Sequence, residues 1–297
     1  MLRVEASKRI ALKNILFLTD FSEPSAVALP FATMIARSYG AKVTALHILL
    51  PSVYQAKVKL ATVVDDQEDL AIAEMQRVDA QLAGVPHETL VERGGGLWPG
   101  LSNLLKEREV DLIVVGTHGL TGLEKTLFGS SAEEVFRRAG VPVLTIGPSV
   151  RTGTHSGARF HSILFATDFN ETCSAAAAYA VSLAQENQAQ LALLHVLPAP
   201  KPGKQSGSGS ISVAEAMHQL CDLVPPDADL WCRPEPIVEH GNPRTEIIAV
   251  ANRCHSDLIV LGVRGMDQLM GATTRAKRPI AYEVVVDAPC PVLTVRG

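Results

Sequence analysis

Asn14-Ile-Leu-Phe-Leu-Thr-Asp20-Phe21 returns later in the chain as Ser162-Ile-Leu-Phe-Ala-Thr-Asp168-Phe169. Three further blocks recur in the same order at a nearly constant separation of 146–149 residues: Val43–Ile48 as Leu191–Val196, Asp111–Gly116 as Asp257–Gly262, and Pro142–Ile146 as Pro291–Val295. Four ordered blocks indicate a duplication. A stretch rich in Gly, Ser and Thr, Ser149–Ala158, separates the copies as a linker. We therefore expect two domains, residues 1–150 and 151–297.

Short apolar runs alternate with helical periods within each copy. In the first copy, the runs that predict buried strands are Ile15–Thr19, Val43–Leu49, His87–Arg93, Leu112–Val115 and Val143–Ile146. The stretches that predict helices are Ser22–Gly40, with Ser22 as N-cap and Gly40 as the stop, then Asp66–Gly84, Gly100–Glu109 and Ser130–Ala139. In the second copy the first helix is expected from Asn170 or Thr172 to about Asn187. This alternation predicts an α/β fold in which each half is a doubly wound, five-stranded parallel sheet flanked by helices.

Composition narrows the class of protein. The 297 residues are 47% hydrophobic and 20% charged, which is typical of a globular protein. With a net charge of −4, the chain has no overall positive charge that would attract nucleic acid or an anionic membrane. Met1–Lys13 lacks the apolar core of a signal peptide, so we expect a cytoplasmic protein. The five cysteines show neither disulfide nor zinc spacing and predict free thiols.

A glycine-rich loop follows the fourth strand of the first copy. The loop contains Gly116, Gly119 and Gly129-Ser130, a spacing that matches neither a Walker loop nor a Rossmann fingerprint. It can nevertheless bind phosphate by the same physical means as those loops. Glycines let backbone N–H groups approach an anion, and a helix that starts at Ser130 would favour phosphate at its N-terminus. The alternative is that the glycines only make a turn and a helix start.

Asp20 closes the first strand, at the edge of the sheet where ligands of such folds bind. Its carboxylate could accept hydrogen bonds from ribose hydroxyls or an adenine amine. The alternative is a cap on the following helix, a place that Ser22 could also fill. His47 and His195 recur within apolar strands, and we interpret both as hydrogen-bonded structural residues, not ligands.

On these residues the chain resembles a tandem universal stress protein over nearly its whole length. The resemblance rests on Leu18–Ser22, Leu46–Ile48 and the loop spacing Gly116, Gly119, Gly129-Ser130. It implies sheets with the strand order 3-2-1-4-5, a fold of the adenine-nucleotide-hydrolase type, and ATP that is bound with Mg²⁺ and turned over little.

The resemblance also implies roles for single residues. Asp20 would contact the ribose, and the backbone of Val43 would meet the adenine edge. Gly116 and Gly119 would lie against the ribose and phosphates. Gly129, Ser130 and Ser131 would receive the β- and γ-phosphates with a hydrated Mg²⁺. It assigns no catalytic residue and no metal-ligating side chain.

The second copy departs from this pattern. Gly262 and Gly265 remain, but Arg278-Pro279 stands where the first copy has Gly129-Ser130. Arginine prevents close backbone approach, and proline has no N–H to donate. Arg264, Arg275, Lys277 and Arg278 could bind a different anion or form a solvated basic loop. We expect a degenerate or altered site there, with Asp168 as a relic or a cap.

Three functions remain open from the sequence. The first is an ATP-binding regulatory protein of the stress response that acts on an unidentified protein partner. A slow ATPase or nucleotidyl-type enzyme is the second, although the loop has no evident catalytic base or arginine finger. The third is an interaction module that dimerises through the last strands, Val143–Ile146 and Val292–Val295. We expect the two halves to form an internal pseudo-dimer and the chain a homodimer, without nucleic-acid or membrane partners.

Overall fold

The computed structural model describes residues 10–50, 61–117, 130–150, 159–170, 172–199, 211–225, 232, 234–264 and 279–297, and only the backbone of 61–66 and 130. The chain divides into two compact units, the first from Ala11 to Pro148 and the second from Ser149 to Gly297. Ile10 belongs with the second unit, where its N–H donates to Ser182 Oγ (3.1 Å). Within the described ranges no helix is long and apolar enough to cross a bilayer.

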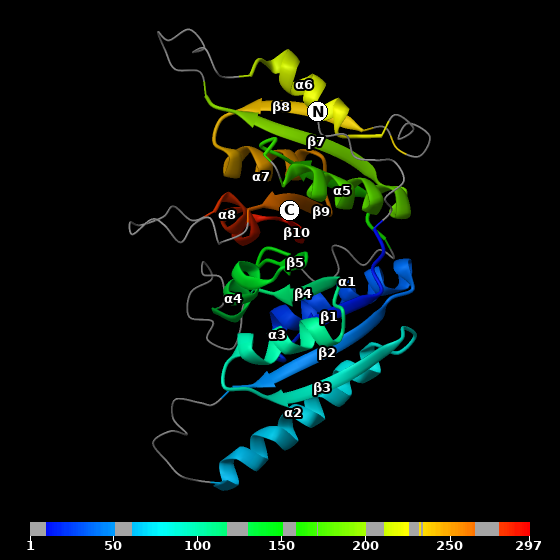
Figure 1. Ribbon diagram of the computed structural model, residues 1–297, viewed down its shortest axis with the longest axis vertical. Coiled ribbons are helices and arrows are strands. Elements are labelled where there is room, and N and C mark those ends of the chain that lie inside the picture. The colour runs from blue at the N-terminus through cyan, green and yellow to red at the C-terminus, as the bar shows by residue number, and fades with distance from the viewer. Residues whose placement is uncertain are drawn as a thin grey trace. The chain divides into compact units, whose positions relative to one another are not determined.

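The first unit is a five-stranded parallel sheet flanked by helices (Figure 1). Its elements are β1 (Asn14–Leu18), α1 (Glu23–Tyr39), β2 (Lys42–Leu49), α2 (Ala61–Gln81), β3 (His87–Arg93), α3 (Leu97–Glu107), β4 (Leu112–Gly116), α4 (Ser130–Arg138) and β5 (Val143–Ile146). The strands lie in the order β3-β2-β1-β4-β5, as the resemblance implied.

The second unit repeats this topology with its own elements. These are β6 (Ser162–Ala166), α5 (Cys173–Asn187), β7 (Gln190–Leu197), α6 (Val213–Asp222), β8 (Glu235–His240), α7 (Pro243–Arg253), β9 (Leu258–Val263), α8 (Ile280–Asp287) and β10 (Val292–Arg296). Its order is β8-β7-β6-β9-β10, and all neighbours are parallel. The predicted pair of doubly wound α/β sheets is thus confirmed.

In each unit, successive strands are added first on one side of the first strand and then on the other. Right-handed crossovers put α1 and α2 on one face of the first sheet and α3 and α4 on the other, where α3 packs against α4. The strands between these layers are buried on both faces: Phe17 and its counterpart Phe165 are each 1% exposed. The switch points lie between β1 and β4 and between β6 and β9, at the carboxyl ends of the strands.

The ends of the helices follow their capping residues. Ser22 is the N-cap of α1 and Gly40 ends it with a φ of 64°, as the sequence predicts. Two starts were predicted too late: α2 begins at Ala61 instead of Asp66, and α3 at Leu97 instead of Gly100. The N-cap of α3 is Gly96, which makes no side-chain cap, so the sequence carries no signal for that start.

An aspartate before the fourth strand anchors the first strand in each unit. Asp111 Oδ2 accepts the N–H groups of Lys13 (2.7 Å) and Asn14 (2.9 Å). Asp257 accepts those of His161 at Oδ2 (2.7 Å) and Ser162 at Oδ1 (3.1 Å). These aspartates lie at the amino ends of the strands, away from the switch points, and their recurrence in both copies is structural.

The last residue of β4 has no room for a side chain. A Cβ at Gly116 would lie 2.6 Å from the carbonyl oxygen of Pro24 in the first turn of α1. At the matching Gly262 it would lie 2.8 Å from Thr172 Oγ1. Each glycine thus lets the first helix approach the fourth strand of its sheet.

We predict that Gly116→Ala destabilises the chain by about 1–3 kcal/mol, because backbone atoms must shift to admit the methyl group. Gly140→Ala is the matched control, since a Cβ there meets no atom within 4 Å. Urea unfolding of both variants measures the difference. Equal stability of the two would contradict the packing role of Gly116.

Candidate functional site

Asp20 lies just beyond the carboxyl end of β1, and hydroxyl groups hold one side of its carboxylate. Oδ1 accepts hydrogen bonds from the Ser22 N–H (3.0 Å), Ser22 Oγ (2.5 Å) and Ser25 Oγ (2.6 Å). Among the described residues none donates to Oδ2. The carboxylate is therefore fixed in orientation, with one oxygen left for another donor.

The structure separates the roles of Asp20 and Ser22. Ser22 is the N-cap residue, and its Oγ accepts from the Ser25 N–H (3.5 Å). Asp20 instead accepts from the side chains of the first turn. The alternative in which Asp20 itself caps α1 is therefore wrong.

Phe21 follows Asp20 with a φ of 61°, a value that bulky residues rarely adopt. Three contacts hold it there. Its N–H donates to Thr19 Oγ1 (3.0 Å), its ring lies 4.3 Å from the His47 ring, and His47 Nδ1 lies 2.8 Å from the Thr19 carbonyl oxygen. A carbonyl oxygen only accepts, so Nδ1 of His47 carries the proton.

The second unit repeats this arrangement in every contact. Phe169 has a φ of 59°, its N–H donates to Thr167 Oγ1 (3.0 Å), and its ring lies 4.4 Å from that of His195. His195 Nδ1 donates to the Thr167 carbonyl (2.8 Å). The interpretation of His47 and His195 as hydrogen-bonded structural residues is confirmed. We call the set of Thr19, Phe21 and His47, with its counterpart in the second unit, the strand-end clasp.

The phosphate end of the first site is described only in part. Gly119 and Gly129 lie outside the described residues. Helix α4 begins at Ser130, as predicted, and Ser131 is exposed in its first turn.

Val43 does not lie with Asp20. It is the second residue of β2, fully buried, and its N–H donates to the carbonyl of Pro86 (2.8 Å). Leu46 is the residue that pairs with Leu18, two positions before Asp20. With a rise of about 3.3 Å per residue, Val43 is roughly 16 Å from Ile48, which lies next to the carboxyl end of β2. Counting from that end would have selected Ile48, because a strand's register, not its apolar character, decides which residue reaches the edge.

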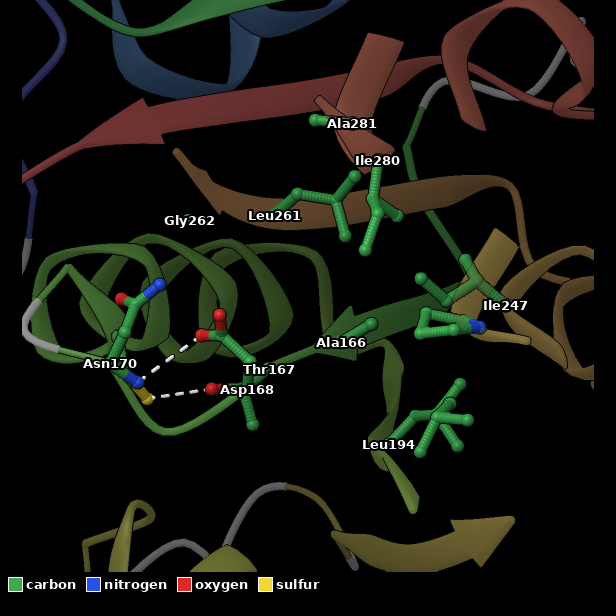
Figure 2. Close-up of a pocket in the computed structure, with 13 residues that line it drawn as sticks. Ala166, Thr167, Asp168, Asn170, Leu194, Ile247, Leu261, Gly262, Ile280 and Ala281 are labelled. Atoms are coloured by element: carbon green, nitrogen blue, oxygen red, sulfur yellow. Dashed lines mark hydrogen bonds between the residues drawn. The ribbon is translucent and has the colours of Figure 1, made fainter. Parts of the chain in front are cut away.

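The second unit contains a cavity of about 120 Å³ at the matching place. Figure 2 shows it lying between the end of β6, the strands β7 and β9, and the starts of α7 and α8. The polar residues Thr167, Asp168 and Asn170 gather at one end. Leu194, Ile247 and Ile280 form the other.

Internal symmetry relates this lining to the first unit. Strand register and helix ends match Ala166, Asp168, Cys173, Val196, Gly262 and Ile280 with Leu18, Asp20, Ser25, Ile48, Gly116 and Ser131. The first group lines one cavity, so the same fold brings the second group to the carboxyl edge of the first sheet. This edge is the candidate site of the first unit.

Comparison with known proteins agrees with the duplication. The model of the universal stress protein family matches the chain twice, over residues 11–147 and 159–296. The chain belongs to the universal stress protein family. A universal stress protein of Mycolicibacterium smegmatis is 25% identical over 297 residues, which cover 95% of this chain and 97% of the relative.

Solved universal stress proteins share the fold. One from Archaeoglobus fulgidus aligns over 95% of this chain and 98% of its own, with 18% identity and a TM-score of 0.66. Another, a universal stress protein in complex with cAMP, covers 47% of this chain and 99% of its own, with 24% identity and a TM-score of 0.37.

We predict that His47→Ala and His195→Ala each destabilise the protein by about 1–2 kcal/mol. Each variant loses the hydrogen bond to a part-buried threonine carbonyl and the ring contact with Phe21 or Phe169. Urea unfolding measures the loss. His218→Ala, whose side chain is 73% exposed, is the control and should change stability by less than about 0.5 kcal/mol. A clasp variant no less stable than this control would contradict the structural role.

Proposed function

We propose that this universal stress protein is an ATP-binding regulatory protein of the stress response, with the nucleotide held in the first unit. The observation that carries the proposal is the pairing of two features at one sheet edge. One is the open Oδ2 of Asp20, and the other is the start of α4 at Ser130, directly after Gly129.

The first step of the argument concerns the sugar. An oriented carboxylate with one oxygen free to accept suits two adjacent hydroxyl groups, because each can donate a charge-assisted hydrogen bond. Ser22 and Ser25 hold Asp20 in place before a ligand arrives, so little ordering is needed on binding. In this proposal Ile48 replaces Val43 beside the base, because its counterpart Val196 lines the cavity of the second unit.

The second step concerns the phosphates. The first N–H groups of α4 have no partner within the helix, and the helix dipole favours an anion there. Ser130 and Ser131 both keep an N–H, and Gly129 would allow a phosphate to approach the backbone.

Mg²⁺ fits this arrangement as a companion of the phosphates. The described residues contain no group of three or more His, Cys, Asp or Glu side chains that could hold a metal ion. Mg²⁺ keeps several waters and binds phosphate oxygens readily, so ATP itself would carry it. Gly129, Ser130 and Ser131 would then receive the phosphates, without a dedicated protein cage for the ion.

The second unit lacks the phosphate end of the site. Pro279 is the N-cap of α8 and has no N–H, and Ile280 occupies the place of Ser131. Arg275, Lys277 and Arg278 lie outside the described residues. We propose that ATP does not bind there and that this unit is mainly structural or carries an altered site.

The test uses the purified full chain. We predict that adenine nucleotide is retained through purification, and that added ATP with Mg²⁺ raises the melting temperature; ligand at 100 times its Kd stabilises by about 2.7 kcal/mol. Chromatography of the extracted ligand and thermal unfolding with ATP, ADP, AMP and cAMP measure this. The panel includes cAMP because one solved relative contains it.

Matched variants locate the site. Gly129→Arg introduces the residue of the second unit and should weaken ATP at least tenfold, as should Asp20→Asn, which removes a charged acceptor worth about 1.5–3 kcal/mol. Asp168→Asn and Gly265→Ala should leave ATP affinity unchanged. An absence of both retained nucleotide and thermal shift would refute the proposal. Multiple-turnover hydrolysis that Gly129→Arg abolishes would instead favour an enzyme.

We also propose that the chain forms a homodimer, as is expected of an interaction module. Light scattering on the 31.7 kDa chain should then give about twice that mass over a range of concentrations. A constant monomer mass at every concentration, with and without ATP, would exclude this association.

A further inference from the structure

The cavity of the second unit differs in chemistry from a nucleotide site. Its existence follows in part from one substitution between the copies. Ala166 stands at the end of β6 where the first unit has Leu18 at the end of β1, and the two are equally buried (6% exposed each). Alanine lacks three carbons of the leucine side chain, and Figure 2 shows Ala166 beside the space.

The walls of this cavity are apolar over one end. Leu194, Ile247, Leu261 and Ile280 converge there from two strands and two helices (Figure 2). Ile280 is the first residue of α8, lies at the rim of the cavity and is 47% exposed. A space of about 120 Å³ is similar to the ~150 Å³ of an engineered apolar cavity that binds benzene. The apolar end therefore suits a body the size of one ring.

The other end carries one carboxylate. Asp168 Oδ1 accepts the Asn170 N–H at 3.2 Å, and no described residue donates to Oδ2. The hydroxyl donors that hold Asp20 are missing, since Asn170 and Cys173 replace Ser22 and Ser25. The Asn170 side chain does not hold the Asp168 carboxylate as Ser22 holds that of Asp20. Its Oδ1 instead accepts from the N–H and Oγ1 of Thr172 (2.8 and 2.6 Å).

The thiol at the cavity wall is neutral. Cys173 is 3% exposed, and Thr167 Oγ1 donates to its sulfur (3.0 Å). Burial raises the pKa of this thiol above its ordinary value. It therefore adds no negative charge and no strong nucleophile to the site.

The described lining contains no Lys or Arg to balance Asp168. The nearby Arg244 is engaged elsewhere, because its Nε donates to Asp287 Oδ2 (2.6 Å) and joins α7 to α8. Pro279 removes an N–H from the start of α8, which would otherwise favour an anion. Among the described residues that line the cavity, Asp168 is thus the one formal charge, and it favours a cation over a phosphate or carboxylate.

From these observations we propose that the second unit binds a small organic amine, whose ammonium group donates to Asp168 and whose apolar body of about one ring fills the space left by Ala166. The head group lies toward solvent, at Asp168, and the body lies among Leu194, Ile247 and Ile280. The amine site lies in the second unit and is distinct from the nucleotide site proposed for the first.

The test is a titration of the full chain with benzylamine as the probe. The δ1 methyl signals of Ile247 and Ile280, observed by NMR in isotopically labelled protein, report on the apolar end. Benzylamine should shift both signals in a saturable way and bind at least tenfold more tightly than benzyl alcohol or benzoate. The alcohol tests the charge of the head group, and benzoate tests its sign.

Two variants separate the body from the head group. Ala166→Leu restores the residue of the first unit, fills the space and should weaken benzylamine at least tenfold. Asp168→Asn changes an exposed side chain and should bring benzylamine to the affinity of benzyl alcohol. Asp20→Asn is the matched control in the other unit and should leave the titrations with benzylamine and with benzyl alcohol unchanged.

Each contrary result overturns the proposal. These are an absence of saturable shifts at Ile247 and Ile280, benzoate or inorganic phosphate binding as tightly as benzylamine, or Asp168→Asn binding the amine as the parent does. The last variant keeps the test decisive if Ala166→Leu fails to fold. Preferred binding of the anions would assign the site to the basic residues between Arg264 and Pro279 instead.

Discussion

The hydrogen bond from His47 to the carbonyl of Thr19 fixes the point where the first strand becomes the first helix, and the candidate site depends on it. This bond satisfies a carbonyl that leaves the sheet ladder, and the imidazole ring supports Phe21 at a positive φ. The backbone turn at Phe21 then places Ser22 at the N-cap of α1 and Asp20 at the edge of the sheet. The same contacts recur in the second unit among Thr167, Phe169 and His195.

The two copies keep the frame and change the lining. The clasp, the aspartate that anchors the first strand and the glycine at the end of the fourth strand recur with nearly identical distances. Among the side chains that differ at the edge, Leu18 is replaced by Ala166, Ser25 by Cys173 and Ser131 by Ile280. The residues of the first group bond backbone groups or leave room for close packing, so their substitution destabilises the fold. The residues at the edge meet solvent or a ligand. Duplication therefore leaves one fold with two chemically different edges.

The frame was largely predictable from the sequence. The alternation of apolar runs and helical periods gave the parallel sheets, and Ser22 and Gly40 gave both ends of α1, because these signals act within a few residues. The start of α3 could not be found, since Gly96 offers no side-chain cap and packing places that helix. The positive φ of Phe21 left no trace in the sequence either, because the ring that packs against it, that of His47, belongs to another strand.

The sequence by itself determined the duplication, the fold class, the family and the contrast between Gly129-Ser130 and Arg278-Pro279, all of which depend on residue type and local order. Only the tertiary structure decided which residues meet at the sheet edge. Strand register places Val43 far from Asp20 and Ile48 near the carboxyl edge of the sheet, and packing across β6, β7 and β9 leaves a cavity beside Ala166. The physical reason is that such a site joins the ends of segments far apart in the chain, and their alignment is fixed by hydrogen bonds and burial between strands, which no local pattern specifies.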